Sequence, residues 1–116
     1  MEAEQRGVVV HLNDADADKQ ASVLRNVVNL RAELGAHIPV EVVVHGPAVT
    51  LLVGGNDAGR QVHELLTGGV RFAACANSLR TQQLDRSAVL DGVQIVPAGV
   101  AHLARRQFDG WAYLRP

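Results

Sequence analysis

Short apolar runs rich in valine alternate with segments of helical periodicity along this chain, and this alternation restricts the possible folds more than any other feature. The runs VVVHLN, VEVVVHG, VRFAACA and VQIVPAG, with WAYL as a fifth candidate, begin at residues 8, 40, 70, 93 and 111. Continuous apolar runs are typical of strands buried on both faces. The intervening stretches are too long for hairpins, so they indicate crossover connections between parallel strands. The sequence therefore predicts one three-layer α/β/α domain over residues 1–116, with a mostly parallel five-stranded sheet.

The segments between the runs carry helical patterns of unequal strength. The strongest follows DADAD, whose aspartates are candidate helix caps, and ends at Leu34 before Gly35. Its apolar residues fall on one predicted stripe: Val23, Leu24, Val27, Val28, Leu30 and Leu34. Further helices are expected over RQVHELL, after Cys75, and over VAHLARRQF. One side of the last helix contains Val100, Leu103, Ala104 and Gln107. The polar side is expected to face solvent or another subunit, and it contains His102, Arg105, Arg106 and Asp109.

The charge balance argues against nucleic acid and membrane surfaces as partners. The chain has 11 Lys and Arg against 12 Asp and Glu, a formal net charge of -1, which gives no broad basic footprint. The acidic start MEAEQRG differs from a signal peptide, and no apolar stretch is long enough to span a bilayer. The single cysteine excludes an intrachain disulfide and is typical of a reducing cytoplasm. We therefore expect a cytoplasmic protein with a free thiol.

Chemically useful residues follow three of the predicted strands at the edge where ligands bind in open parallel sheets. They are His11 and Asn13 after the first strand, His45 after the second, and Cys75, Asn77, Ser78 and Arg80 after the third. A thiol is activated by a helix N-terminus, a nearby cation and some access to solvent. Asn77 or Ser78 is a candidate cap for the next helix, and Arg80 supplies a cation. Cys75 is therefore a candidate nucleophile, although a buried cysteine can also serve only as a small apolar filler.

Other interpretations of these residues remain open at this stage. His11 and His45 titrate near neutral pH and are candidates for tuning a sulfur atom, or they simply bond to backbone at strand ends. Together with Cys75 they would supply three zinc ligands, but the chain lacks any compact zinc-binding spacing, so we predict no metal and no cofactor. The segment GGNDAG is glycine-rich, but no Gly-Lys-Ser/Thr follows it, and an ordinary turn is favoured over a phosphate loop.

Several segments together resemble the DsrE/DsrF-like family over nearly the whole chain, and most closely its short stand-alone members. The segments are VEVVVHGP, VRFAACANSLR, VQIVPAGVAHL and RRQFDGWAYLRP, with His11 and a helix containing Asn26 and Asn29. The resemblance implies a three-layer α/β fold and assembly into homotrimers or hexamers. In sulfur-handling members, the cysteine at the position of Cys75 accepts sulfane sulfur as a persulfide and passes it to a partner protein. His11, His45, Asn77 and Arg80 match the family pattern near this site.

The resemblance favours an intracellular sulfur-relay protein that uses Cys75 and exchanges sulfur with donor and acceptor proteins. A dithiol oxidoreductase would need a second cysteine. One alternative is an oligomeric module that binds a small ligand or anion, with Asn13 and the other strand-end residues lining the pocket. Another is a structural subunit in which Phe108, Trp111 and Tyr113 form an oligomer interface or part of the core.

Overall fold

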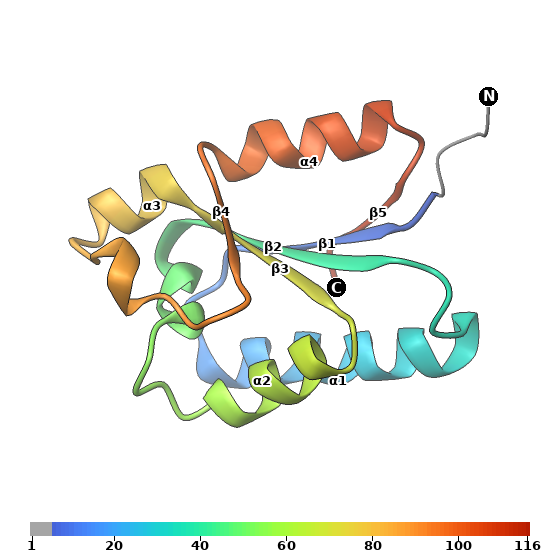
Figure 1. Cartoon of the computed structure of the whole chain (residues 1–116), viewed down its shortest axis with the longest axis horizontal. Coiled ribbons are helices and arrows are strands. Elements are labelled where there is room, and N and C mark those ends of the chain that lie inside the picture. Colours follow the sequence, from blue (N-terminus) through green and yellow to red (C-terminus); the bar gives the residue numbers. More distant parts are fainter. Residues whose placement is uncertain (1–5) are drawn as a thin grey trace.

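The computed structural model describes residues 6–116, and its described part contains one sheet of five strands (Figure 1). The strands follow the order β4-β3-β2-β1-β5, and all four pairings are parallel. The predicted mostly parallel five-stranded sheet is confirmed. The strand bounds are β1 (Val8–Leu12), β2 (Val40–Val44), β3 (Arg71–Cys75), β4 (Gln94–Val96) and β5 (Ala112–Leu114).

Helices cover both faces of this sheet. Helices α1 (Ala17–Leu34) and α2 (Gly59–Thr67) lie on one face, and α4 (Gly99–Phe108) lies on the other (Figure 1). The short α3 (Ala76–Thr81) follows β3 directly, and two 3-10 helices occupy Gly46–Leu52 and Arg86–Ala88. This arrangement places the carboxyl ends of β1, β2 and β3 beside one another, because the strands are parallel neighbours.

Side chains on successive strand residues point to opposite faces, which divides the core into two clusters. Val10, Val42 and Val44 pack with residues of α1 and α2. Val9, Val43 and Ala73 pack on the other face with Leu103 of α4 and with Trp111. Both faces of the central strands are buried, which explains why these strands read as continuous apolar runs.

Helix α1 begins within the aspartate-rich segment, one of whose aspartates caps it, and ends before Gly35, as the sequence pattern predicts. Asp16 caps the helix by accepting a hydrogen bond from the Lys19 backbone N–H at 2.9 Å. Gly35 follows the last turn with a φ of 89°, in the region that favours glycine. No helix within residues 6–116 is both long and apolar enough to cross a membrane.

The predicted apolar stripes of two helices are wider than the buried ones. Val28 is 53% exposed, where it lines a groove between α1 and α2, and Leu34 is 41% exposed at the last residue of α1. In α4, Leu103 is buried but Val100 is 62% exposed. Helical periodicity marks a face but not how far the neighbouring layer extends over it, so these members of the stripes stay exposed.

Candidate functional site

A row of reactive side chains crosses the carboxyl edge of the sheet on the face covered by α4. Val9, Val43 and Ala73 point toward α4, and strand residues two positions later share their face. His11, His45 and Cys75 are those residues. Backbone at His45 stays extended beyond the end of β2, with φ -142° and ψ 177°. Tyr113 is the register partner of Val9 and extends the same row onto β5.

Cys75 ends β3 and is itself the N-cap of α3. Its Sγ accepts a hydrogen bond from the Ser78 backbone N–H at 3.4 Å. The expectation that Asn77 or Ser78 would cap this helix was wrong, since the helix begins at Ala76. The Cys75 side chain is also more enclosed than expected, with only 5% of the residue exposed.

Hydrogen-bond donors surround the Cys75 sulfur and favour its anionic form. Burial by itself raises the pKa of the Cys75 thiol. The Ser78 hydroxyl and the backbone N–H groups of Gly99, Ser78 and Asn77 outweigh burial, so the pKa lies below its usual value. The Ser78 oxygen accepts the Gly46 N–H at 2.6 Å, which leaves its own proton available for the sulfur. The thiol is therefore activated by donors from α3 and from the N-terminus of α4.

Gly99 lets α4 approach this closely. A Cβ atom at Gly99 would lie 3.0 Å from the His45 Cβ and 3.4 Å from the Cys75 Cβ. Gly99 is the first residue of α4, whose N-cap Ala98 makes no side-chain hydrogen bond. The absent side chain therefore lets the helix N-terminus fit between the cysteine and the histidine.

The two strand-end histidines contact each other, as their position at neighbouring strand ends predicts. Their Nε2 atoms lie 2.5 Å apart and their rings stack at a centroid distance of 4.7 Å. His11 Nδ1 lies 2.6 Å from the Tyr113 hydroxyl. Burial lowers the pKa of both histidines, the charge on Arg115 lowers it further, and the charge on His45 adds to the effect at His11. Both rings are therefore held toward their neutral forms.

Three further residues singled out in the sequence lie outside this row. Arg80 donates a hydrogen bond to the Asn77 side chain, and both residues are exposed. Arg80 is therefore engaged on the surface of α3. It is not among the groups that lower the pKa of the Cys75 thiol. Asn13 accepts a hydrogen bond from Arg115 at 3.5 Å and lines a pocket of about 260 Å³ with His11, Asp14 and Lys19.

Sequence reasoning missed a buried ionic group on the α4 face of the sheet. Glu41, inside the second apolar run, is completely buried. It accepts hydrogen bonds from Arg106 Nε at 2.7 Å and His102 Nε2 at 2.8 Å. Arg106 also lies over the Trp111 ring, 4.3 Å from its centroid. The prediction that His102 and Arg106 face solvent or a second subunit was therefore wrong, because both reach inward to the carboxylate.

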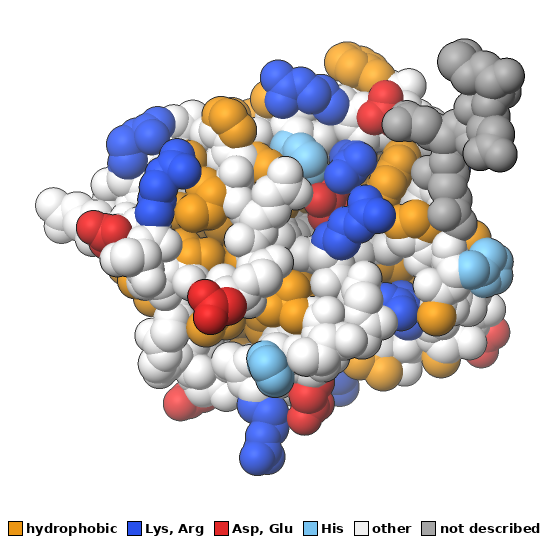
Figure 2. All heavy atoms as spheres, in the orientation of Figure 1, with side chains coloured by type: hydrophobic (Ala, Val, Ile, Leu, Met, Phe, Trp, Pro, Cys, Tyr) orange, Lys and Arg blue, Asp and Glu red, His pale blue; other side chains and the backbone are white. Residues whose placement is uncertain are grey.

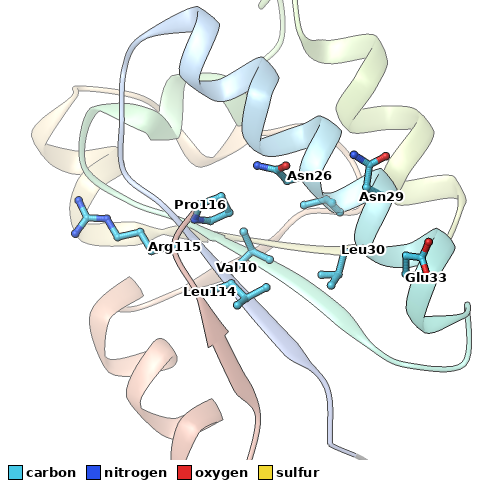
Figure 3. Close-up of a pocket in the computed structure, with 9 residues that line it drawn as sticks. Val10, Asn26, Asn29, Leu30, Glu33, Leu114, Arg115 and Pro116 are labelled. Carbon is cyan, nitrogen blue, oxygen red and sulfur yellow. The ribbon is translucent and has the colours of Figure 1, made fainter.

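The described residues contain no metal-binding cluster, but they form a pocket away from Cys75. Within residues 6–116, no group of three or more His, Cys, Asp or Glu side chains is placed to hold a metal ion. A pocket of about 510 Å³ opens between α1 and the C-terminal strand, on the face opposite Cys75 (Figure 3). Its lining includes Asn26, Asn29, Glu33 and Leu114. This pocket is separated from the thiol by the sheet itself.

Comparisons with known proteins agree with the fold and with the resemblance. The model of the DsrE/DsrF-like family matches residues 7–116. None of the curated proteins compared with the chain matches it significantly. Among solved structures, a protein of unknown function from Methanobacterium thermoautotrophicum, MTH1491, is 40% identical with a TM-score of 0.91, over 96% of this chain and 99% of that one.

Two more distant structures share the fold. The YchN protein of E. coli is 18% identical with a TM-score of 0.83, over 96% of this chain and 99% of its own. A conserved protein of unknown function from Bacteroides thetaiotaomicron is 14% identical with a TM-score of 0.71, over 93% and 94% of the two chains.

Proposed function

The chain belongs to the DsrE/DsrF-like family, which is linked to sulfur relay, and on this basis we propose that Cys75 carries one sulfane sulfur atom as a persulfide. One observation carries the proposal. The Cys75 sulfur lies among four hydrogen-bond donors at two helix N-termini, and its pKa is lowered despite its burial. A thiolate is the nucleophilic form of cysteine, so this environment suits attack on sulfur.

The proposed transfer balances without an added oxidant or reductant. The Cys75 thiolate attacks the outer sulfur of a donor persulfide, R–S–SH, and supplies the electron pair of the new S–S bond. The bond between the two donor sulfurs breaks, and its electron pair leaves with the donor as RS⁻. A thiolate of an acceptor protein then attacks the outer sulfur on Cys75, and Cys75 leaves as thiolate. One cysteine is sufficient for both steps.

Intact-protein mass spectrometry tests this function. The reduced protein, incubated with a low-molecular-weight persulfide and freed of excess reagent, is expected to gain the mass of one sulfur atom. The gain should disappear when a second protein thiol is added and should be absent in Cys75→Ala. No gain in the wild type, or an equal gain in Cys75→Ala, would overturn the proposal.

A second candidate function is binding of a small anion without sulfur transfer. The pocket beside His11 supports it, because Lys19 and Arg115 line its wall, although Asp14 lies there too. Native mass spectrometry of gently purified protein is the test. A retained anion, together with no sulfur adduct on Cys75, would favour this function over the relay.

We also propose that the protein works as a homo-oligomer, a trimer or a hexamer, with separate proteins as sulfur donor and acceptor. Phe108 is 84% exposed and Val100 is 62% exposed on α4. Hydrophobic side chains are visible among basic ones over this helix in Figure 2. Contiguous exposed apolar surface is typical of protein interfaces, and we propose that Phe108 and Val100 contribute to such a surface. Light scattering should then give a mass of three or six chains, and Phe108→Ser should reduce it.

A reducing cytoplasm is the compartment that the proposed sulfur relay through a free thiol implies.

A further inference from the structure

Tyr113, His11 and His45 form a continuous hydrogen-bonded chain that ends beside Cys75. The Tyr113 hydroxyl contacts His11 Nδ1 at 2.6 Å, and His11 Nε2 contacts His45 Nε2 at 2.5 Å. His45 directly follows Val44, the register partner of Ala74, so His45 and Cys75 occupy adjacent positions on neighbouring strands. Both residues also lie against the first residue of α4, since a Cβ atom at Gly99 would lie 3.0 Å from the His45 Cβ and 3.4 Å from the Cys75 Cβ.

The two ends of this hydrogen-bonded series, Tyr113 and His45, differ in how they can exchange a proton. Tyr113 is 39% exposed, so its hydroxyl can exchange a proton with solvent. At the other end, His45 Nδ1 has no hydrogen-bond partner among residues 6–116. Arg115, Asp14 and Lys19 line the pocket beside His11, and Arg115 disfavours a positive charge on either ring.

Two neutral proton arrangements satisfy both contacts. In the first, Tyr113 donates to His11 Nδ1, His11 Nε2 donates to His45, and the remaining proton of His45 lies on Nδ1. In the second, His11 Nδ1 donates to Tyr113, His45 Nε2 donates to His11, and His45 Nδ1 is a bare acceptor. The first becomes the second when His45 Nδ1 releases its proton and Tyr113 takes one from solvent, because one proton shifts across each contact.

We propose that Tyr113, His11 and His45 form a proton wire that lends one proton to the sulfur being transferred at Cys75. This inference rests on the proposed function and adds a proton donor to it. The acidic outer sulfur of a persulfide is anionic at neutral pH and repels an incoming thiolate. A proton delivered from His45 Nδ1 converts the donor R–S–S⁻ into R–S–SH, which the Cys75 thiolate attacks.

The proton balance closes over the whole transfer. The donor R–S–S⁻ takes one proton from His45, the wire takes one from solvent at Tyr113, and attack gives Cys75–S–SH and RS⁻. The new persulfide then returns its proton through the wire, which leaves Cys75–S–S⁻ and the wire in its first arrangement. No net proton or electron is consumed, so the wire acts as a true catalyst of the exchange.

The test compares Tyr113→Phe with the wild type in single-turnover loading by a low-molecular-weight persulfide. The substitution removes only the hydroxyl at a half-exposed position, so the fold is expected to survive. Loading of Cys75 should slow about tenfold, since general acid–base groups contribute at least that much, and the final adduct should be unchanged. The solvent deuterium isotope effect on loading should fall toward that of an unassisted reaction. A ¹⁵N spectrum should also show altered imidazole shifts at His45, which Tyr113 reaches only through His11.

His63→Gln is the matched control, because His63 is an exposed histidine on α2, away from the row. It should change neither the rate nor the isotope effect. If Tyr113→Phe loads at the wild-type rate with the wild-type isotope effect, the wire is wrong while the carrier function stands. If neither protein gains sulfur, the carrier function is wrong, and the wire has no role in sulfur transfer.

Discussion

The carboxylate of Glu41, in the central strand of the sheet, accepts a hydrogen bond at 2.7 Å from Arg106, which reaches it from α4. The Glu41 side chain is completely shielded from solvent, whereas 22% of the Arg106 side chain is exposed. Burial alone raises the pKa of Glu41, but hydrogen bonds from Arg106 and His102 and the charges of both residues outweigh it. The pKa of Glu41 therefore lies below its usual value, and the ionised carboxylate links α4 to the sheet.

Replacing Arg106 should lower the free energy of unfolding, because it leaves the buried Glu41 charge without its main partner. Arg106→Met keeps much of the side-chain volume but leaves the Glu41 carboxylate with His102 alone. Loss of one partner of a buried ion pair costs about 3–5 kcal/mol, so the free energy of unfolding should fall by about 3 kcal/mol in urea titrations at pH 7. Arg105→Met is the control, since Arg105 is exposed on the same helix and should have little effect. Equal losses in the two variants would contradict the assigned role of Arg106.

The same group should make stability depend on acid pH. The ordinary pKa of Glu is 4.5, and the pKa of Glu41 in the folded protein is lower. The unfolded chain therefore binds a proton at Glu41 before the folded protein does. The stabilisation is complete above pH 4.5 and is lost as the pH falls through the folded pKa. In unfolding measurements from pH 7 to pH 3, Glu41→Gln should flatten this decline.

Glu33→Gln provides the comparison for that experiment, because Glu33 is an exposed carboxylate on α1. Its curve should run parallel to that of the wild type. A Glu41→Gln curve that is as steep as the wild-type curve would show that other carboxylates cause the acid sensitivity.

How well a feature could be predicted depends on whether a local pattern marks it or whether it needs a partner distant in the sequence. The five strands were predictable because each is a local apolar run bounded by turn residues, and β1, β2 and β3 begin within one residue of the predicted starts. The meeting of His11 and His45 also followed from parallel topology, which brings strand ends to one edge. These features need only short-range pattern and general rules of sheet connection.

The missed features depend on partners that are distant in sequence. Glu41 and Arg106 are 65 residues apart, so nothing local marks a glutamate in an apolar run as an ion-pair partner. Tyr113 and His11 are 102 residues apart and meet only because β5 pairs with β1 at the sheet edge. The cap at Cys75 was missed for a different reason, since sulfur is an uncommon N-cap acceptor and Asn and Ser are the usual ones.

Removing the Ser78 hydroxyl should reduce the reactivity of Cys75. That hydroxyl is the strongest single group that lowers the pKa of the thiol. Ser78→Ala should raise this pKa and slow alkylation by iodoacetamide at neutral pH by about tenfold, the lower end for a hydrogen bond to a charged group. The pH profile of alkylation gives the measurement. Ser87→Ala, at an exposed serine in the second 3-10 helix, should react as the wild type does. An unchanged profile in Ser78→Ala would assign the activation to backbone donors alone.

The close approach of α4 to the thiol can be tested with a pair of glycines that each begin a helix. Gly99→Ala would place a Cβ atom 3.0 Å from the His45 Cβ, whereas Gly59→Ala at the start of α2 would meet nothing within 4 Å. Alanine favours a helix over glycine by about 0.5–1 kcal/mol, so Gly59→Ala should be neutral or slightly stabilising. Gly99→Ala should instead cost about 1–2 kcal/mol, because overpacking outweighs that gain.

The thiol should report the same displacement independently of stability. A shift of the α4 N-terminus away from Cys75 weakens the Gly99 N–H contact, so the pKa of the thiol should rise in Gly99→Ala and stay constant in Gly59→Ala. Urea unfolding and alkylation profiles of the two variants provide both measurements. If Gly99→Ala is as stable as Gly59→Ala and its thiol reacts like the wild type, then α4 has room to spare above Cys75. The helix N-terminus would then have no part in activating the sulfur.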